Sequence, residues 1–146
     1  MQVIELKNKY KEKTTQLIVD VAVNEHGFTE WEESILKFEN EFYKNNKGNC
    51  WIAVNESEDV VGTISLRKIN KSRAEIKNLY IHSDFRKQGI AQKLLNNLTD
   101  FARDNEYKQL QLDTYSEFDK AIKLYEKNGF IREDTIDGRH IYSKCI

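Results

Sequence analysis

The segment from Leu79 to Ala91 contains residues whose types and spacing suit the binding of a phosphate anion. Arg86 and Lys87 carry positive charge, and Gly89 and Ala91 are small residues at the start of an amphipathic stretch. A helix start exposes unpaired backbone N–H groups and the positive end of the helix dipole, so small side chains there leave room for a diphosphate. The alternative interpretation is that Arg86 and Lys87 are solvated charges beside a turn glycine.

Strands and helices that could position this segment alternate along the chain. Segments 51–54 and 60–69, joined by a polar turn, predict strands, and alternating apolar and polar residues predict strands at 74–81 and 108–114. One apolar stripe predicts a helix over 88–103. Because this helix separates the strands at 74–81 and 108–114, those strands can run parallel through a right-handed crossover. We expect this unit to lie at the centre of the fold, after an antiparallel meander.

The N-terminal part of the chain is expected to hold a short strand followed by helices. Residues 3–6 fit the strand, and helical spacing around Leu17 ends near Gly27. A second helix is expected to begin at Thr29, because its hydroxyl can form a capping box with Glu32. The apolar face of this helix contains Trp31, Ile35, Phe38 and Phe42.

The C-terminal part is expected to end in a helix and a hairpin. A short helix over 119–127 stops at Asn128-Gly129, where glycine can take the left-handed conformation that ends a helix. Strands at 130–136 and 140–144 flank Asp137-Gly138, a pair that is typical of a tight hairpin turn.

Length, charge and cysteine content limit the class of protein. The 146 residues fit one domain, residues 1–146, and a net charge of -1 with a pI near 6.3 provides no basic field for nucleic acid. Cys50 and Cys145 lie far apart without a metal-binding spacing, so we expect neither a metal site nor a disulfide framework. No segment has the apolar length of a membrane span and the N-terminus lacks a signal-peptide pattern, so we expect a cytoplasmic protein.

Two motifs, in this order, resemble those of the GCN5-related N-acetyltransferase (GNAT) family. The run from Arg86 to Ala91 is similar to the family's Arg/Gln-x-x-Gly-x-Gly/Ala signature between a strand and a helix, and residues 121–130 resemble its Ala-x-x-x-Tyr-x-x-x-Gly-Phe segment. The resemblance covers residues 50–145 well and residues 1–45 loosely. It implies an α/β fold of the GNAT type: a mixed, mostly antiparallel central sheet flanked by about four helices, with a splayed parallel strand pair at its centre.

The resemblance also implies acetyl-CoA as the cofactor, used as a co-substrate, and no metal. Leu79 and Ile81, which end the strand before the signature, are expected to pair their backbone with the pantetheine arm. Tyr125 corresponds to the tyrosine that protonates the departing thiolate in many members, a role that a phenol can fill. The alternative for Tyr125 is a core aromatic residue on a short amphipathic helix. The family's pyrophosphate cradle, mostly backbone N–H groups, corresponds here to Arg86, Lys87, Gln88, Gly89, Ile90 and Ala91.

The remaining candidates concern the acceptor. An attacking amine must be neutral, whereas a lysine-like amine is mostly protonated near neutral pH, so some group must take its proton. Glu75 matches a position where some members place a glutamate that acts through water, and a solvated strand carboxylate is the alternative. His26 and Tyr80 are further candidates for this base. We expect His26, Phe28 and Tyr80 to contact the substrate.

One position departs from the family pattern. Many members carry asparagine three residues before the alanine of the second motif, where it contacts the pantetheine arm or CoA, and this chain has Phe118 there. Ser116 or Asp119 could substitute for that asparagine.

The sequence therefore predicts direct transfer of an acetyl group from acetyl-CoA to a primary amine in a ternary complex. A small-molecule amine is favoured over a protein lysine or a peptide N-terminus, because a domain without extensions offers little surface for docking a protein. The alternative is a catalytically inactive domain that binds acetyl-CoA or has a regulatory role, and an interaction domain without a cofactor is a third reading. A homodimer is compatible with the resemblance.

Overall fold

One seven-stranded sheet forms the framework of the computed structural model, which describes residues 1–37 and 40–146. The strands lie in the order β1-β2-β3-β4-β5-β7-β6. Neighbouring strands are antiparallel except β4 and β5, which run parallel. This is the mixed, mostly antiparallel sheet expected from the sequence. The strands are β1 (Gln2–Glu5), β2 (Asn49–Val54), β3 (Val60–Lys68), β4 (Arg73–Ile81), β5 (Gln109–Tyr115), β6 (Ile131–Ile136) and β7 (Arg139–Cys145).

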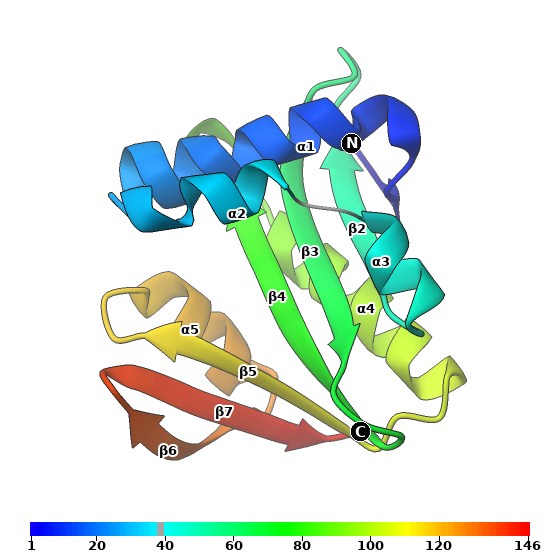
Figure 1. Ribbon diagram of the computed structural model, residues 1–146, viewed down its shortest axis with the longest axis vertical. Coiled ribbons are helices and arrows are strands. Elements are labelled where there is room, and N and C mark those ends of the chain that lie inside the picture. Colours follow the sequence, from blue (N-terminus) through cyan, green and yellow to red (C-terminus); the bar gives the residue numbers. More distant parts are fainter. Residues whose placement is uncertain (38–39) are drawn as a thin grey trace.

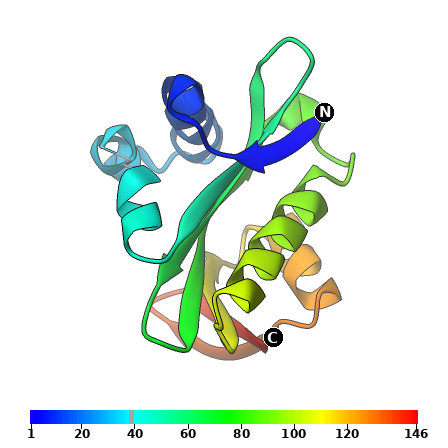
Figure 2. The same cartoon turned by 90° about the vertical axis from the view of Figure 1, so that its right-hand side faces the viewer.

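Helices cover both faces of the sheet, as Figure 1 and Figure 2 show. One face carries α1 (Lys11–Ile18) with its π-helical continuation (Val19–Glu25), α2 (Glu32–Leu36) and α3 (Asn40–Asn45). The other face carries α4 (Ile90–Asp104) and α5 (Asp119–Lys127). Short 3-10 turns span Asn8–Tyr10, Thr29–Trp31 and Ser83–Phe85. Because both faces are covered, β2 and most of β3 are buried.

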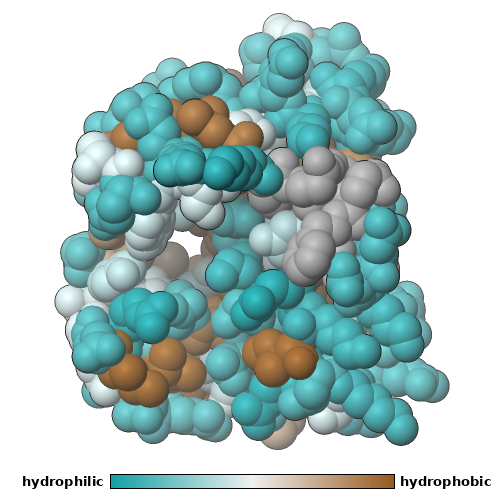
Figure 3. All heavy atoms as spheres, in the orientation of Figure 1, coloured by the Kyte–Doolittle hydropathy of each residue, from teal (hydrophilic) through white to brown (hydrophobic). Residues whose placement is uncertain are grey.

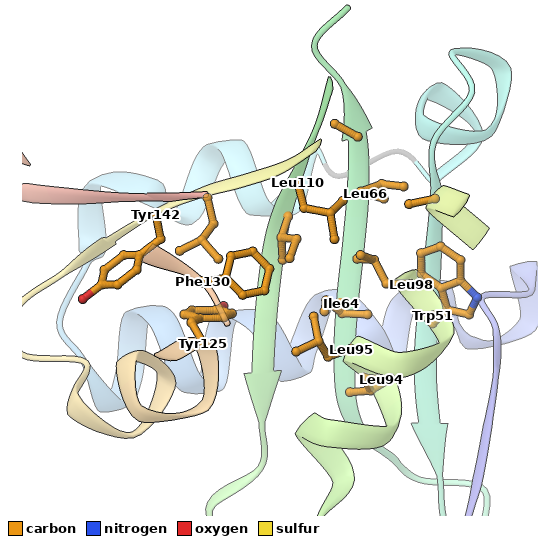
Figure 4. Packing of buried hydrophobic residues seen from close by; sticks show 14 of the residues in the cluster. Trp51, Ile64, Leu66, Leu94, Leu95, Leu98, Leu110, Tyr125, Phe130 and Tyr142 are labelled. Atoms are coloured by element: carbon orange, nitrogen blue, oxygen red, sulfur yellow. The ribbon is translucent and has the colours of Figure 1, made fainter. Parts of the chain in front are cut away.

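Two buried clusters hold these helices on the sheet. Leu94 and Leu98 of α4 pack toward β3 with Ile64 (Figure 4). On the opposite face, Leu17 of α1 lies in a second cluster with Ile52 of β2. Burying a leucine side chain stabilises a fold by about 1.5–3 kcal/mol, so the apolar stripe predicted over 88–103 is what fixes α4 in place.

Most elements expected from the sequence are confirmed, with small shifts at their ends. The strands at 51–54, 60–69, 74–81 and 108–114 are present, and α5 has the predicted bounds. The helix predicted from residue 88 begins two residues later, at Ile90, because Gly89 is left-handed and serves as its N-cap. Within the described ranges, every helix is too short or too polar to span a lipid bilayer.

The capping box predicted at Thr29 is wrong. Thr29 is the first residue of a 3-10 turn, and no side chain forms a capping hydrogen bond at Phe28 or Trp31, the residues that precede this turn and α2. Stacking of the Phe28 ring on the Trp31 ring, with centroids 4.1 Å apart, shapes the turn instead. Phe38, predicted on the same helix, and the side chain of Phe42 lie outside the described part of the chain.

The parallel strands β4 and β5 pair over only part of their length. Among the described residues, pairing joins 73–75 to 109–111. Figure 1 shows the two strands starting together and then diverging, β4 toward α1 and α2 and β5 away from them. One edge of β4 is therefore left without a neighbouring strand over residues 76–81, while β3 pairs with its other edge. This is the splayed pair that the sequence led us to expect.

Candidate functional site

A groove with a volume of about 1250 Å³ lies between the diverging strands. It is lined by β4, the loop after β4, the start of α4, the end of β5 and α5, together with parts of segment 21–35 from the first helices. Figure 3 shows the molecule hollowed at this place. Both motifs singled out in the sequence therefore line one groove, which is larger than the roughly 300–1,000 Å³ typical of small-molecule pockets.

A β-bulge sets the direction of the β4 side chains that reach the groove. The register with β3 shifts at this point, and Asn78 has a positive φ of 56°. After the bulge, Leu79 and Ile81 pack against the cluster on the α4 side, and Tyr80 packs against the cluster on the α1 side. The unpaired edge leaves backbone amide and carbonyl groups of this segment available to an extended ligand.

The loop between β4 and α4 has the geometry of an anion cradle. Lys87 and Gly89 have positive φ angles of 65° and 79°, so the chain turns tightly before α4. No side chain caps the helix, and the first backbone hydrogen bond runs from the Lys93 N–H to the Gly89 carbonyl, at 3.2 Å. The N–H groups of residues 90–92 therefore lack helical acceptors and can bind an anion. A side chain at Gly89, which lines the groove, would meet no protein atom within 4 Å.

The guanidinium group of Arg86 is hydrogen-bonded within the protein, so it is not free to make a bidentate contact with a phosphate. Its terminal nitrogens donate to the carboxylate of Glu25 at 2.5 and 2.6 Å, and its Nε–H donates to the Ile81 carbonyl at 3.1 Å. The hydrogen bonds from Arg86 lower the pKa of Glu25, and those to Glu25 raise the pKa of Arg86. Glu25 therefore joins the first helical segment to the cradle.

The other predicted cradle residues divide between the groove and the outer surface. Lys87, Ile90 and Ala91 line the groove. Gln88 is exposed and is not among the described residues that line the groove, so it contributes to the cradle at most through its backbone. The structure thus brings most of the signature to the cavity.

Tyr125 is buried in the wall of the groove. Its side chain is 5% exposed, and its ring packs edge-on against Phe130 with centroids 5.6 Å apart (Figure 4). Burial raises the pKa of the phenol far above its ordinary value, and the nearby Tyr80 and Asp113 add to the shift. The phenol therefore keeps its proton at neutral pH, which suits a proton donor.

Two side-chain contacts fix the elements on either side of Tyr125. The amides of Gln92 and Asn128 exchange two hydrogen bonds of 2.9 Å, which hold the end of α5 against α4. Arg139 of β7 donates to Asp113 of β5 at 2.6 Å. Both pairs span elements that are distant in sequence, so the position of Tyr125 depends on the assembled fold.

The three candidate general bases, Glu75, Tyr80 and His26, are placed less favourably for their predicted role than Tyr125 is for its own. Glu75 lies in the paired part of β4, where its carboxylate accepts a hydrogen bond from Arg67 at 2.9 Å and lies 3.6 Å from the Lys77 ammonium group. Glu75 is not among the residues that line the groove, so its action through water stays a prediction. Tyr80 lines the groove, but burial raises its pKa to about 12, so its phenol is protonated at neutral pH. His26 is exposed at the groove.

Five aromatic side chains, which we call the aromatic wall, meet at one side of the groove. Two of them, His26 and Phe28, were expected from the sequence to contact the substrate. Trp31, Tyr115 and Phe118 lie beside them and were not predicted as site residues. The sequence did contain a signal for two of these residues. Tyr115 ends the parallel strand β5 and Phe118 lies shortly after it, and ligands commonly bind at the carboxyl ends of parallel strands.

Comparison with known proteins places the chain among acetyltransferases. The model of the Acetyltransferase (GNAT) family matches residues 8–130. Human N-acetyltransferase 8 is 34% identical over 94 residues, which are 60% of this chain and 41% of that protein, so the chain spans under half the length of this relative.

Solved structures show the same fold over the whole chain. A GNAT acetyltransferase from Staphylococcus aureus Mu50 has a TM-score of 0.87 at 22% identity, covering 99% of this chain and 98% of that one. The PaiA N-acetyltransferase from Thermoplasma acidophilum, solved in complex with coenzyme A, has a TM-score of 0.82 at 20% identity, with coverage of 99% and 98%. At these identities the likeness is one of fold.

Proposed function

The chain belongs to the acetyltransferase (GNAT) family, and we propose that it transfers the acetyl group of acetyl-CoA to a primary amine. One observation carries the proposal: a single groove joins the unpaired edge of β4, the uncapped start of α4 and the buried phenol of Tyr125. A donor with a peptide-like arm and a diphosphate needs the first two features side by side.

The residues present fit this donor. The N–H groups of residues 90–92 would bind the pyrophosphate, and the absence of a side chain at Gly89 leaves the approach open. The backbone of Leu79 and Ile81 would pair with the pantetheine arm, which would lie where β4 lacks a neighbouring strand. Arg86 contributes by bracing the loop through Ile81 and Glu25. Acetyl-CoA supplies a thioester that is reactive toward an amine and leaves as a thiolate.

Tyr125 is the proposed proton donor. Tyr125 lines the same groove as the cradle, and burial keeps its hydroxyl protonated. A thiol has an ordinary pKa near 8.5, below that of this phenol, so proton transfer from Tyr125 to the thiolate is unfavourable by itself. The step balances when the attacking nitrogen loses a proton as the C–S bond breaks, because that proton restores the phenol. The role therefore depends on the position of the Tyr125 oxygen, which α5 fixes against α4 through Gln92 and Asn128.

We further propose that residues 1–146 act as one domain and that the acceptor is a small molecule. A single sheet runs through the described chain and its helices pack on two faces of that sheet, which supports one domain. The groove is bordered by the first helices on one side and by β5 and α5 on the other. An acceptor of modest size fits between these walls better than a folded protein does.

Two measurements test the proposal. Acetyl-CoA at about a hundred times its dissociation constant should stabilise the native state by about 2.7 kcal/mol, a rise of roughly 5–10 °C in the unfolding midpoint. Release of free CoA thiol should then depend on an added primary amine. No midpoint shift would contradict acetyl-CoA binding, and a shift without amine-dependent thiol release would favour the inactive binding domain.

A further inference from the structure

The five rings of the aromatic wall pack against one another. The Phe28 ring lies almost parallel to that of Trp31, at 4.1 Å and 11°, and near that of Tyr115, at 5.5 Å and 25°. His26 meets Phe118 edge-on at 4.8 Å. These separations and angles are those of attractive aromatic pairs, so each ring helps to hold its neighbour in place.

The wall is separate from the cores that stabilise the fold. Neither of the two buried clusters in the described chain includes any of its five rings. Phe28, Trp31, Tyr115 and Phe118 are partly exposed, and His26 is exposed. All of the wall residues except Phe28, which lies among the other rings, line the groove. Apolar rings that remain partly exposed in a groove are typical of a ligand surface.

Two of the acidic residues that line the groove are paired with arginines. Glu25 is paired with Arg86 and Asp113 with Arg139, each through a contact of 2.6 Å. The other carboxylates of the described groove residues are exposed to solvent, as Glu30 is. A second ammonium group on a substrate would therefore find no buried, unpaired carboxylate there, whereas an uncharged planar group would find ring faces.

We propose that the aromatic wall binds the apolar, planar part of the acceptor, so that the preferred substrate is a primary monoamine that carries an aromatic ring. The inference rests on the proposed acetyl transfer and names its acceptor class. It also gives a role to Phe118, which stands where the family pattern has asparagine. In place of a polar side chain, this position adds a ring to the wall, packed against His26 and Phe28.

Equilibrium binding tests the inference without requiring turnover. Phenethylamine, cyclohexylethylamine and putrescine are titrated by calorimetry into protein that contains CoA, so that no acetyl group is available. The first two amines match in apolar size and differ in planarity, and putrescine has two charges. We expect phenethylamine to bind about tenfold more tightly than either of the others. Because the chain has two tryptophans and Trp51 is buried in the core, phenethylamine should also change the fluorescence of Trp31.

Three variants connect this preference to the wall. Trp31→Ala should abolish the advantage of phenethylamine, and Trp31→Phe should retain most of it. Leu36→Ala is the matched control, because Leu36 lies on the adjacent α2, is 62% exposed and does not line the groove. Unfolding midpoints show whether each variant is folded. An equal effect of Trp31→Ala and Leu36→Ala on the preference would contradict the assignment.

The outcomes for the acceptor class and for acetyl transfer are distinguishable. Equal affinity for the three amines, or tighter binding of putrescine, would overturn the aromatic acceptor while leaving amine-dependent thiol release in place. Absence of thiol release with every amine would overturn acetyl transfer, and the binding preference would still confirm or contradict the role of the wall.

Discussion

The part of the groove that we propose binds the donor, residues 79–91 (the donor half), is built from backbone groups. The part that we propose binds the acceptor, the aromatic wall (the acceptor half), is built from side chains. In the donor half the proposed binding groups are the open edge of β4 and the N–H groups at the start of α4. These groups belong to one continuous run of the chain. The wall instead combines residues 26–31 with residues 115–118, which meet only in the folded protein.

This difference has a consequence for how each half of the site depends on the sequence. A backbone cradle depends on conformation and on small residues, so its composition can be read as a motif. A wall of side chains depends on which residues the fold brings together, so it can change its ligand by substitution while the scaffold stays the same. The donor half should therefore be sensitive to backbone changes, and the acceptor half to side-chain changes.

The sharpest test of the boundary between the halves is Tyr125→Phe. Turnover should fall by about a hundredfold, because loss of a general acid typically costs at least that much. Affinity for acetyl-CoA and for the amine should not change, since the ring that packs on Phe130 is kept. Steady-state kinetics with a separate calorimetric titration check this, and unchanged turnover would count against the proton-donor role.

The second largest effect is expected from a backbone change in the donor half. Gly89→Val adds a branched side chain at a residue that lines the groove and has a φ of 79°, so acetyl-CoA affinity should fall about tenfold or more. Gly138→Val is the control, because Gly138 has a φ of 78° and open space around its Cβ but does not line the groove.

Both glycine substitutions should lower the free energy of unfolding by about 1–2 kcal/mol through left-handed strain. Only Gly89→Val should weaken binding of acetyl-CoA, measured as the loss of the ligand-induced midpoint shift. Equal acetyl-CoA affinity in the two variants would break the assignment of the cradle.

Phe118→Asn places the family's usual residue in the wall and should act on the acceptor half alone. It removes the edge-on contact with His26, so KM for an aromatic amine should rise about threefold to tenfold. KM for acetyl-CoA should not rise, because an amide at this position is what many family members present to the donor. A larger effect on acetyl-CoA than on the amine would contradict the division into halves.

The smallest expected effect concerns the ion pair that joins the halves. Glu25→Gln removes a charge from the partly exposed pair with Arg86, so the free energy of unfolding should fall by less than about 1 kcal/mol at neutral pH. Because Arg86 lowers the pKa of Glu25 in the folded state, this stabilisation is complete above the unfolded pKa of about 4.3 and is lost as the pH falls through the folded pKa. Urea unfolding of both proteins across this range should show their difference shrinking at acidic pH, and a difference that grew there would contradict the pairing.

Much of the framework could be predicted from the sequence. The parallel pair followed from a helix placed between two strands, and the splay followed from the family resemblance. The start of α4 was predicted to within two residues, and the open position at Gly89 followed from local glycine chemistry. The pairing of Arg86 with Glu25 was not visible in the local pattern, because the two residues lie 61 positions apart. Glu75, expected near the acceptor, is held by Arg67 of the neighbouring strand.

The sequence by itself determined the features that depend on neighbouring residues: the strand and helix periods, the glycine that begins α4 and the order of the two motifs. Only the tertiary structure decided which charges are neutralised and which rings face the groove. The physical reason is the distance along the chain over which each feature is determined. Backbone conformation is set largely by a residue and its neighbours, whereas the partner of a side chain is set by whichever segments the packed core brings against it.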